Sequence, residues 1–266
     1  MDRIREAITR ARDAGAKALA ASQPARATPA APVAYFTRQH ADDDDRFTPV
    51  SCKFERFAEN RIISNEQDPV LNAYRVLRTR ILQKMEKENW RTIAVVSACA
   101  GAGKTVTAIN LAIAIGSRKG SRATLVDLDF YRPRIAEYLG LDETPSVLDY
   151  FEGSKSLEEV TVRPDLPDVL VLANERVSRR GAEHLTSARA DAMVAKAVDD
   201  YHSRVVIFDM SPLLGCDDAI AFLPKVDCVL LVTASNQTRI KELKDAKRVL
   251  ANHNLIGTVL NKAPVA

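Results

Sequence analysis

The stretch Ser97-Ala98-Cys99-Ala100-Gly101-Ala102-Gly103-Lys104-Thr105 decides the fold of this chain of 266 residues. It follows an apolar run, Ile93–Val96, and precedes a stretch with helical periodicity, Val106–Ile115. A strand, a glycine-rich turn, Lys-Thr and a helix in this order are typical of a phosphate-binding loop, because backbone N–H groups and the helix N-terminus bind phosphate oxygens there. The strict pattern Gly-x-x-x-x-Gly-Lys-[Ser/Thr] has Gly at the position of Ala98, but the flanking strand and helix favour a nucleotide loop over a chance match.

The loop supplies two side chains with defined chemistry. Lys104 is expected to reach the β- and γ-phosphates of a nucleotide, and the Thr105 hydroxyl to occupy one coordination position on Mg²⁺. We therefore predict a nucleotide site formed by consecutive residues of the loop and the start of the helix: Ala100, Gly101, Ala102, Gly103, Lys104, Thr105 and Val106.

Composition places the chain among ordinary globular proteins. Charged residues make up 27% and hydrophobic residues 46% of the sequence, so most of it should fold. The length accommodates one α/β domain with an extension. The net charge of +3 is too small to argue for a nucleic-acid partner, and we predict none.

Cysteine usage and hydropathy predict a cytosolic location. Cys52, Cys99, Cys216 and Cys228 are scattered without C-x-x-C spacing, which disfavours a zinc site or a disulfide framework and suits a reducing compartment. The apolar runs have the length of strands, so no membrane span is expected. The N-terminus has no apolar signal-peptide core.

Three regions follow one another along the chain. Residues 1–20 have the pattern of a short amphipathic helix, which we interpret either as docking on a membrane surface or partner, or as a solvated helix with an alanine stripe. Residues 21–64 are rich in Ala and Pro, hold the acidic run Asp42–Asp45, and predict a flexible linker. Residues 65–266 are expected to form the P-loop nucleotide-binding domain.

Strand-like and helix-like patterns alternate through the predicted domain. The expected strands are 91–97, 123–129, 169–173, 204–209, 228–233 and 256–260, and the expected helices begin near Pro69 and cover 104–119, 133–139, 146–151, 187–201 and 238–253. Continuously apolar strands alternating with helices predict an α/β fold, a doubly wound and mostly parallel sheet with helices on both faces. Ligands of such sheets bind at the carboxyl ends of the strands, where the phosphate-binding loop lies.

Two acidic clusters end apolar strands of this sheet. Asp127 and Asp129 follow one apolar run, and Asp209 follows another. An Asp at the end of a buried strand is costly to desolvate unless a partner such as hydrated Mg²⁺ satisfies it, although a single Asp is more often a helix cap. We predict that Asp209 and Asp129 bind Mg²⁺ with Thr105, and that Asp127 is the general base or positions the attacking group. With Lys104 they form the expected catalytic group, although spacing alone does not separate their roles.

Asp217 and Asp218 follow the Asp209 strand after a loop that contains Pro212. The pattern favours an N-cap and a first-turn acid for a helix over 219–223. A role in sensing the nucleotide state is the alternative.

Five motifs in the right order resemble the bacterial tyrosine kinases (BY-kinases) of capsular and exopolysaccharide synthesis. The resemblance covers about residues 68–262 and rests on Asp68–Pro69 with Ala73–Thr79, Ser97–Thr105 with Asn110–Ala112, Leu125–Asp129 with Arg132–Pro133, Ile207–Leu214, and Gly257–Lys262. It implies binding of MgATP and autophosphorylation on tyrosine, which in that family tunes polymer length and export. By position, the family's Walker A, Walker A′ and Walker B residues fall on Lys104 and Thr105, Asp127 and Asp129, and Asp209.

The resemblance also implies partners and a location. Asn261, in the last matching segment, joins the predicted nucleotide-binding residues. The family acts with a membrane polysaccharide co-polymerase, a Wzz-like chain-length determinant, which implies a cytoplasmic protein that is peripheral on the inner face of the bacterial plasma membrane. The helix that carries Arg75 and Arg78 matches a segment used for subunit contacts around a ring, which implies a homo-oligomer, although Asn72 replaces the Glu that opens that motif.

Other positions depart from the family pattern. Ala102 stands where the family has Glu, Tyr131 where it has Arg, and Ser211 where it has Pro. The chain also ends at Ala266 without the tyrosine-rich tail that is the family's usual phosphoacceptor, and Tyr35 is the only well-exposed tyrosine by pattern.

These departures keep three hypotheses open. The first is a BY-kinase-like protein that regulates surface-polysaccharide assembly, as a tyrosine kinase or only as an ATPase. The second is a catalytically weak scaffold in which ATP orders a docking surface for a membrane protein. The third is a MinD/ParA-type positioning ATPase, which the absence of a Lys at the position of Cys99 disfavours.

Overall fold

A computed structural model describes residues 45–263 of the chain. The expected helix within residues 1–20, Tyr35 and most of the expected linker lie outside this part. Within residues 45–263, no helix is both long enough and apolar enough to cross a membrane.

An eight-stranded sheet forms the centre of this part of the chain, in the order β1-β4-β5-β3-β6-β2-β7-β8. The strands are β1 (Thr48–Val50), β2 (Thr92–Ser97), β3 (Ala123–Leu128), β4 (Val162–Pro164), β5 (Val169–Leu172), β6 (Val205–Met210), β7 (Cys228–Ala234) and β8 (Leu255–Asn261). All neighbouring pairs are parallel except β4 and β5. The predicted α/β fold with a mostly parallel sheet is confirmed.

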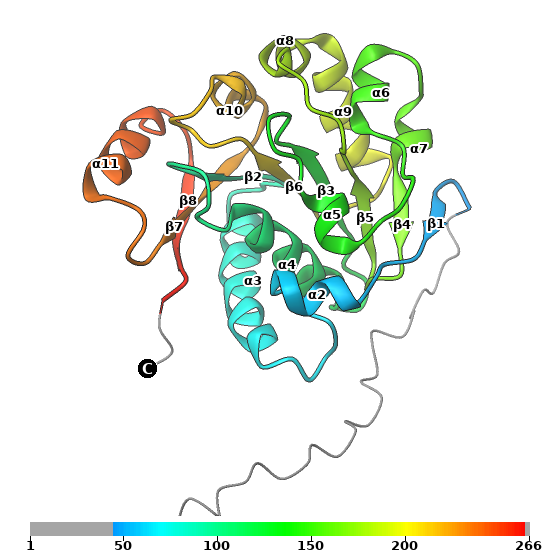
Figure 1. Ribbon diagram of the computed structural model, residues 1–266, viewed down its shortest axis with the longest axis horizontal. Coiled ribbons are helices and arrows are strands. Elements are labelled where there is room, and N and C mark those ends of the chain that lie inside the picture. The colour runs from blue at the N-terminus through cyan, green and yellow to red at the C-terminus, as the bar shows by residue number, and fades with distance from the viewer. Residues whose placement is uncertain (1–44, 264–266) are drawn as a thin grey trace, which may run out of the picture. The chain divides into compact units, whose positions relative to one another are not determined.

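Helices cover both faces of the sheet (Figure 1). They are α2 (Glu55–Asn60), α3 (Pro69–Lys87), α4 (Lys104–Gly116), α5 (Ile135–Leu139), α6 (Val147–Glu152), α7 (Leu157–Val160), α8 (Gly181–Thr186), α9 (Ala188–Asp199), α10 (Asp218–Phe222) and α11 (Ile240–Val249), with a short 3-10 turn at Leu223–Lys225. The expected strands and helices of residues 65–263 are found within a few residues of their predicted bounds.

Alternation along each strand explains why two apolar cores form. In β2, Val95 packs with α3 and α4 on one face, whereas Ala94 and Val96 belong to the core on the α9 and α10 face. Successive side chains of a strand point to opposite faces, so a strand that is apolar throughout needs cover on both. Helix α4 lies between the sheet and α3, which explains why nearly all of its residues are buried.

The fold begins earlier than residue 65, so the expected linker over 21–64 is wrong for its last part. Strand β1 pairs with β4, and α2 follows it. Phe47, Phe57 and Ile63 are at most 1% exposed. Ile63 donates its backbone N–H to the side chain of Asn110 in α4. These elements are too short to show a periodic pattern, because β1 has three residues and α2 has six.

Candidate nucleotide-binding site

The loop between β2 and α4 contains two glycines with positive φ angles. Gly101 and Gly103 have φ values of +83° and +92°, which side-chain-bearing residues rarely adopt. A Cβ on Gly103 would also lie 2.0 Å from the side-chain nitrogen of Asn261. Ala98 has no positive φ and is buried, so Ala fits where the strict pattern has Gly. Helix α4 begins at Lys104, immediately after this turn.

Sheet topology brings the predicted carboxylates to this loop. Strand β6 lies between β3 and β2, and Asp209 is in register with Asp127 on one side and Val95 on the other. The Thr105 hydroxyl donates to Asp209 Oδ2 at 2.6 Å. The loop and the carboxyl ends of β3 and β6 therefore meet at one edge of the sheet, as the sequence predicted.

Lys104 is held by two of these carboxylates. Its Nζ lies 2.6 Å from Asp129 Oδ2 and 3.5 Å from Asp209 Oδ1, and the lysine is only 8% exposed. Burial alone would lower the pKa of Lys104, but Asp209 and Asp129 raise it above its ordinary value. Burial raises the pKa of Asp209, an effect that Lys104 and the Thr105 hydroxyl oppose. The site thus concentrates one buried cation among buried carboxylates.

Asp127 is placed differently from Asp129. It is fully buried, and its two oxygens accept backbone N–H groups from Asp129 at 3.2 Å, Arg134 at 3.1 Å and Ile135 at 3.0 Å. Burial, and then the charge of Asp209, raise its pKa well above the ordinary value. Asp127 therefore caps the start of α5, which is the alternative role that the sequence offers for a single Asp at the end of a strand. This geometry favours a role in positioning the turn that carries Asp129.

The end of β8 supports the loop from the other side. Asn261 donates its side-chain amide to the carbonyl of Ala102 at 3.0 Å, and Lys262 Nζ donates to the carbonyl of Gly101 at 2.7 Å. Asn261, predicted to bind nucleotide, therefore contacts the loop backbone. Lys262 did not figure among the predicted site residues, although its place beside Asn261 is the signal that could have indicated it.

The loop after β6 also contacts the site. Leu213 and Leu214 donate backbone N–H groups to the carbonyls of Ser97 and Ala98. The Ser211 hydroxyl donates to Asp129 Oδ1 at 3.0 Å. Ser211 was noted only as a departure from the family pattern, yet it contacts the same carboxylate as Lys104.

Two other predicted features have local roles in the structure. Arg78 donates its guanidinium to the carbonyl of Ala114 at 2.7 Å, so it binds the last turn of α4. Arg75 is half-buried, and its Nη1 donates to Asn72 Oδ1 at 3.4 Å. Tyr131 is 44% exposed, so the expectation that Tyr35 alone is well exposed is wrong, because Tyr131 lies on a turn just beyond β3.

Six of the exposed apolar side chains lie at or beyond the carboxyl ends of strands. We call them the apolar rim: Tyr131, Val177, Leu214, Ile220, Ile240 and Leu260. Exposed apolar side chains grouped at one edge often mark a contact surface for another macromolecule.

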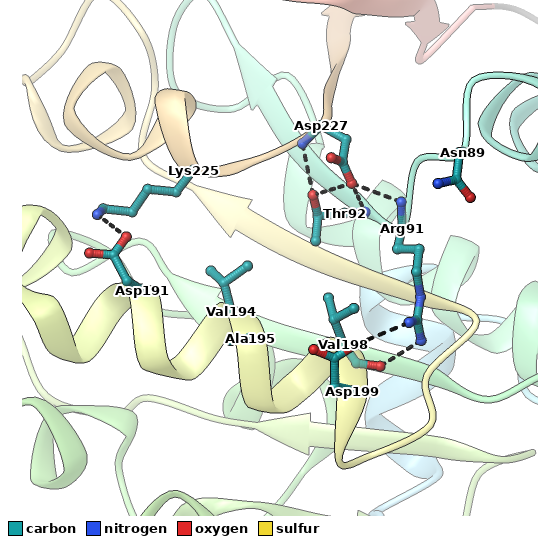
Figure 2. A pocket seen from close by; sticks show the side chains of 10 residues that line it. All are labelled: Asn89, Arg91, Thr92, Asp191, Val194, Ala195, Val198, Asp199, Lys225 and Asp227. Atoms are coloured by element: carbon teal, nitrogen blue, oxygen red, sulfur yellow. Dashed lines mark hydrogen bonds and ion pairs between the residues drawn. The ribbon is translucent and has the colours of Figure 1, made fainter.

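A separate open cavity of about 360 Å³ lies at the opposite, amino edge of the sheet (Figure 2). Its charged side chains are already paired. Asp227 Oδ2 accepts the backbone N–H groups of Arg91 and Thr92 and the Thr92 hydroxyl, each at 2.8 Å. Lys225 forms an ion pair with Asp191. The glycine-rich loop lies at the other edge, between the carboxyl end of β2 and the start of α4.

The donor set at the loop fits Mg²⁺ in the form that nucleotide sites use. Within residues 45–263, no group of three or more His, Cys, Asp or Glu side chains is placed to hold a metal by itself. Magnesium in such sites is bound through one or two carboxylates together with substrate phosphates and water, so a complete protein cage is not needed. Thr105, Asp129 and Asp209 supply the hard oxygen ligands that this arrangement requires.

Comparison with known families agrees with this geometry. A ParA family model, described as NUBPL iron-transfer P-loop NTPase, matches residues 89–249, more than half of the chain. The chain belongs to the ParA family of P-loop NTPases. The matched residues run from β2 through the phosphate-binding loop to α11, and so contain the whole carboxylate cluster.

Relatives within this family include proteins named tyrosine kinases. The tyrosine-protein kinase YwqD of Bacillus subtilis is 27% identical over 207 residues, which cover 76% of this chain and 86% of YwqD. CpsD of Streptococcus pneumoniae, also named a tyrosine-protein kinase, is 26% identical over 73% of this chain and 84% of CpsD. EpsB of Ralstonia solanacearum is 28% identical over 73% of this chain, which spans about a quarter (26%) of EpsB. The resemblance to bacterial tyrosine kinases is confirmed.

Solved structures share the fold. The chimerical protein CapA2B2 superimposes with a TM-score of 0.71 at 21% identity, over 82% of this chain and 94% of that one. The kinase domain of the Escherichia coli tyrosine kinase ETK gives 0.66 at 24% identity, over 74% and 78%. MinD of Pyrococcus horikoshii, solved with Mg-ADP, gives 0.55 at 22% identity, over 64% and 69%.

Proposed function

We propose that this P-loop NTPase binds MgATP at the edge of the sheet formed by β2, β3 and β6 and transfers or hydrolyses its γ-phosphate. The observation that carries the proposal is the cluster of Lys104, Thr105, Asp129 and Asp209, joined by contacts of 2.6 to 3.5 Å at the start of α4. A buried ammonium next to a helix N-terminus is the arrangement that stabilises charge on a transferring phosphoryl group.

The chain's own residues have separable tasks in this proposal. The backbone N–H groups of the loop and the N-terminus of α4 bind phosphate oxygens. Lys104 moves from Asp129 and Asp209 to the β- and γ-phosphates, because these carry more negative charge than the two carboxylates. Thr105 and Asp209 hold Mg²⁺, with Asp129 as the further carboxylate. When bound, Mg²⁺ would neutralise negative charge that develops on the phosphates. Asp127 fixes the turn that carries Asp129, and its assignment as general base is the alternative.

We further propose a BY-kinase-like role in exopolysaccharide or capsule assembly, on the inner face of the bacterial plasma membrane. The kinase names of YwqD and CpsD support the activity, and the sequence resemblance supports the polysaccharide role. The residues of the apolar rim lie at the carboxyl edge of the sheet, as the proposed site does, so we propose this rim as the face that meets a membrane co-polymerase or another copy of the chain. Tyr131 belongs to this rim and is the described tyrosine best placed to accept a phosphoryl group.

A nucleotide switch without kinase activity is the second candidate. The likeness of fold to MinD favours it, as do Ala102, Tyr131 and Ser211, where the chain departs from the kinase pattern. In this candidate, ATP orders the apolar rim for a partner, and hydrolysis releases it.

The test follows two products from the purified protein with MgATP. ADP and phosphotyrosine are measured together, and phosphorylated tyrosines are mapped by mass spectrometry, with Lys104→Met and Asp209→Asn as controls. Lys104-dependent phosphotyrosine supports the kinase, and ADP without phosphotyrosine supports the switch. Unchanged turnover in Lys104→Met would contradict the site itself.

A further inference from the structure

Asp218 is a buried carboxylate that the proposed site does not use. It is the first residue of α10 and is 1% exposed, and its Oδ2 has no hydrogen-bond partner among the described residues. A Cβ on Gly181, the first residue of α8, would lie 2.3 Å from this oxygen. The close approach of α8 to the carboxylate therefore depends on a glycine at position 181.

Capping does not account for this residue. Asp217 occupies the N-cap position of α10 without a side-chain cap, and Asp218 is turned inward instead of toward the solvent. A buried oxygen without a partner costs stability, and an amide or hydroxyl at this position would avoid burying a charge. Stability alone therefore does not explain an aspartate at position 218.

Ser211 connects Asp218 with the site. Its hydroxyl donates to Asp129 Oδ1 at 3.0 Å, while the other oxygen of Asp129 binds Lys104. Burial and the neighbouring charge of Asp217 raise the pKa of Asp218 to about 6, whereas the N–H of Ala182 and the Ser211 hydroxyl lower it. The Ser211 hydroxyl therefore acts on both carboxylates, donating to Asp129 and lowering the pKa of Asp218, and its single proton can be donated to only one of them at a time.

We propose that Asp218 is a positioning residue for Asp129 and acts through the Ser211 hydroxyl. In the described arrangement, Ser211 donates to Asp129 while Asp129 holds Lys104. When Lys104 turns to the phosphates, Asp129 is free to turn toward Mg²⁺, and Asp218 is the acceptor to which the Ser211 hydroxyl can then turn. Because Asp218 also contacts α8 at Gly181, this exchange links the nucleotide site to α8. The inference rests on the proposed function, since it needs nucleotide and Mg²⁺ at the loop.

The test compares Asp218→Asn with the matched control Asp217→Asn. The control makes the same replacement of a carboxylate by an amide at the exposed neighbouring residue. For each full-length protein, the ATP dissociation constant is measured with Mg²⁺ and with a chelator, beside the thermal midpoint without ligand. We expect the Mg²⁺-dependent gain in affinity to fall about tenfold in Asp218→Asn, the size seen when groups behind metal ligands are removed. The midpoint should stay equal or rise, because a buried charge is lost. Asp217→Asn should keep the wild-type Mg²⁺-dependent gain in affinity, and its midpoint should stay equal or rise, because a like charge beside Asp218 is lost.

A double-mutant cycle with Ser211→Ala tests the route. If Asp218 acts through Ser211, the two single variants and the double variant should lose the same Mg²⁺-dependent affinity. Additive losses would overturn the route. A lower thermal midpoint in Asp218→Asn with an unchanged Mg²⁺-dependent gain would overturn the positioning role and leave a structural one. Absence of Mg²⁺-dependent ATP binding in the wild type would instead contradict the proposed function, so the two failures are distinguishable.

Discussion

The two edges of the sheet use charge in opposite ways. At the amino edge, Asp227 accepts three hydrogen bonds and Lys225 pairs with Asp191 (Figure 2). At the carboxyl edge, Asp218 keeps an oxygen without a partner, and Asp127 and Asp209 are crowded together in full burial. The paired edge stabilises the chain, whereas the crowded edge has raised carboxyl pKa values of the kind that mark functional sites.

The difference follows from where the backbone supplies donors. At the start of β2, the backbone N–H groups of Arg91 and Thr92 donate to one carboxylate oxygen of Asp227, which also accepts the Thr92 hydroxyl. After β3 and β6, the strands end with carboxylates that face one another across the sheet, and Lys104 is the cation placed between Asp129 and Asp209. In the proposed function, a bound phosphate takes that cation from the carboxylates, so we expect the carboxyl edge to change when nucleotide binds.

The largest expected effect is on activity at the carboxyl edge. Lys104→Met should lower ATP turnover by at least about a hundredfold, because the charge-stabilising cation is lost. Steady-state ADP release measures it, and far-ultraviolet circular dichroism checks the fold. Turnover within a factor of about two of the wild type would contradict a catalytic site at the carboxyl edge.

The next effect is on stability at the amino edge. Asp227→Ala leaves the N–H groups of Arg91 and Thr92 and the Thr92 hydroxyl without their acceptor, and should lower the free energy of unfolding by about 2 kcal/mol. Urea unfolding followed by the fluorescence of Trp90 gives the value. Affinity for ATP should not change in this variant, and a loss of affinity would show that the two edges are coupled.

The third prediction concerns the carboxyl edge, where Asp218 should make the free energy of unfolding depend on pH by about 1 kcal/mol. Asp218 has a folded-state pKa of about 6, above its unfolded value near 4, so its ionisation destabilises the fold above pH 6 and this penalty fades as the pH falls. The gain in unfolding free energy from pH 7 to pH 5 should therefore be about 1 kcal/mol larger in the wild type than in Asp218→Asn. Equal gains would contradict the buried ionised state of Asp218.

The smallest effect is expected at the ion pair of the amino edge. Lys225→Met should change the free energy of unfolding by less than about 1 kcal/mol, because Asp191 is exposed and exposed pairs contribute little. The measurement is the same urea titration, repeated at high salt. A loss comparable to that of Asp227→Ala would mean that the pair is less solvated than its exposure indicates.

Much of the carboxyl edge could be predicted from the sequence. Gly101, Gly103, Lys104 and Thr105 form a local motif whose spacing predicts the loop. Asp residues at the ends of parallel strands lie at the same edge of the sheet, so their proximity could also be predicted. Lys262, Ser211 and Asp218 could not be assigned, because their contacts depend on which distant segments meet: β8 with the loop, and α8 with α10. The capping role of Asp127 likewise depends on the turn before α5, and β1 and α2 gain their stability from partners far along the chain.

The most direct measurement is calorimetric titration of the full chain with ATP, with and without Mg²⁺, in the wild type, Lys104→Met and Asp227→Asn. We expect the wild type and Asp227→Asn to bind ATP alike and more tightly with Mg²⁺, and Lys104→Met not to bind. Equal binding by all three proteins, or no binding by the wild type, would contradict the nucleotide site at the carboxyl edge.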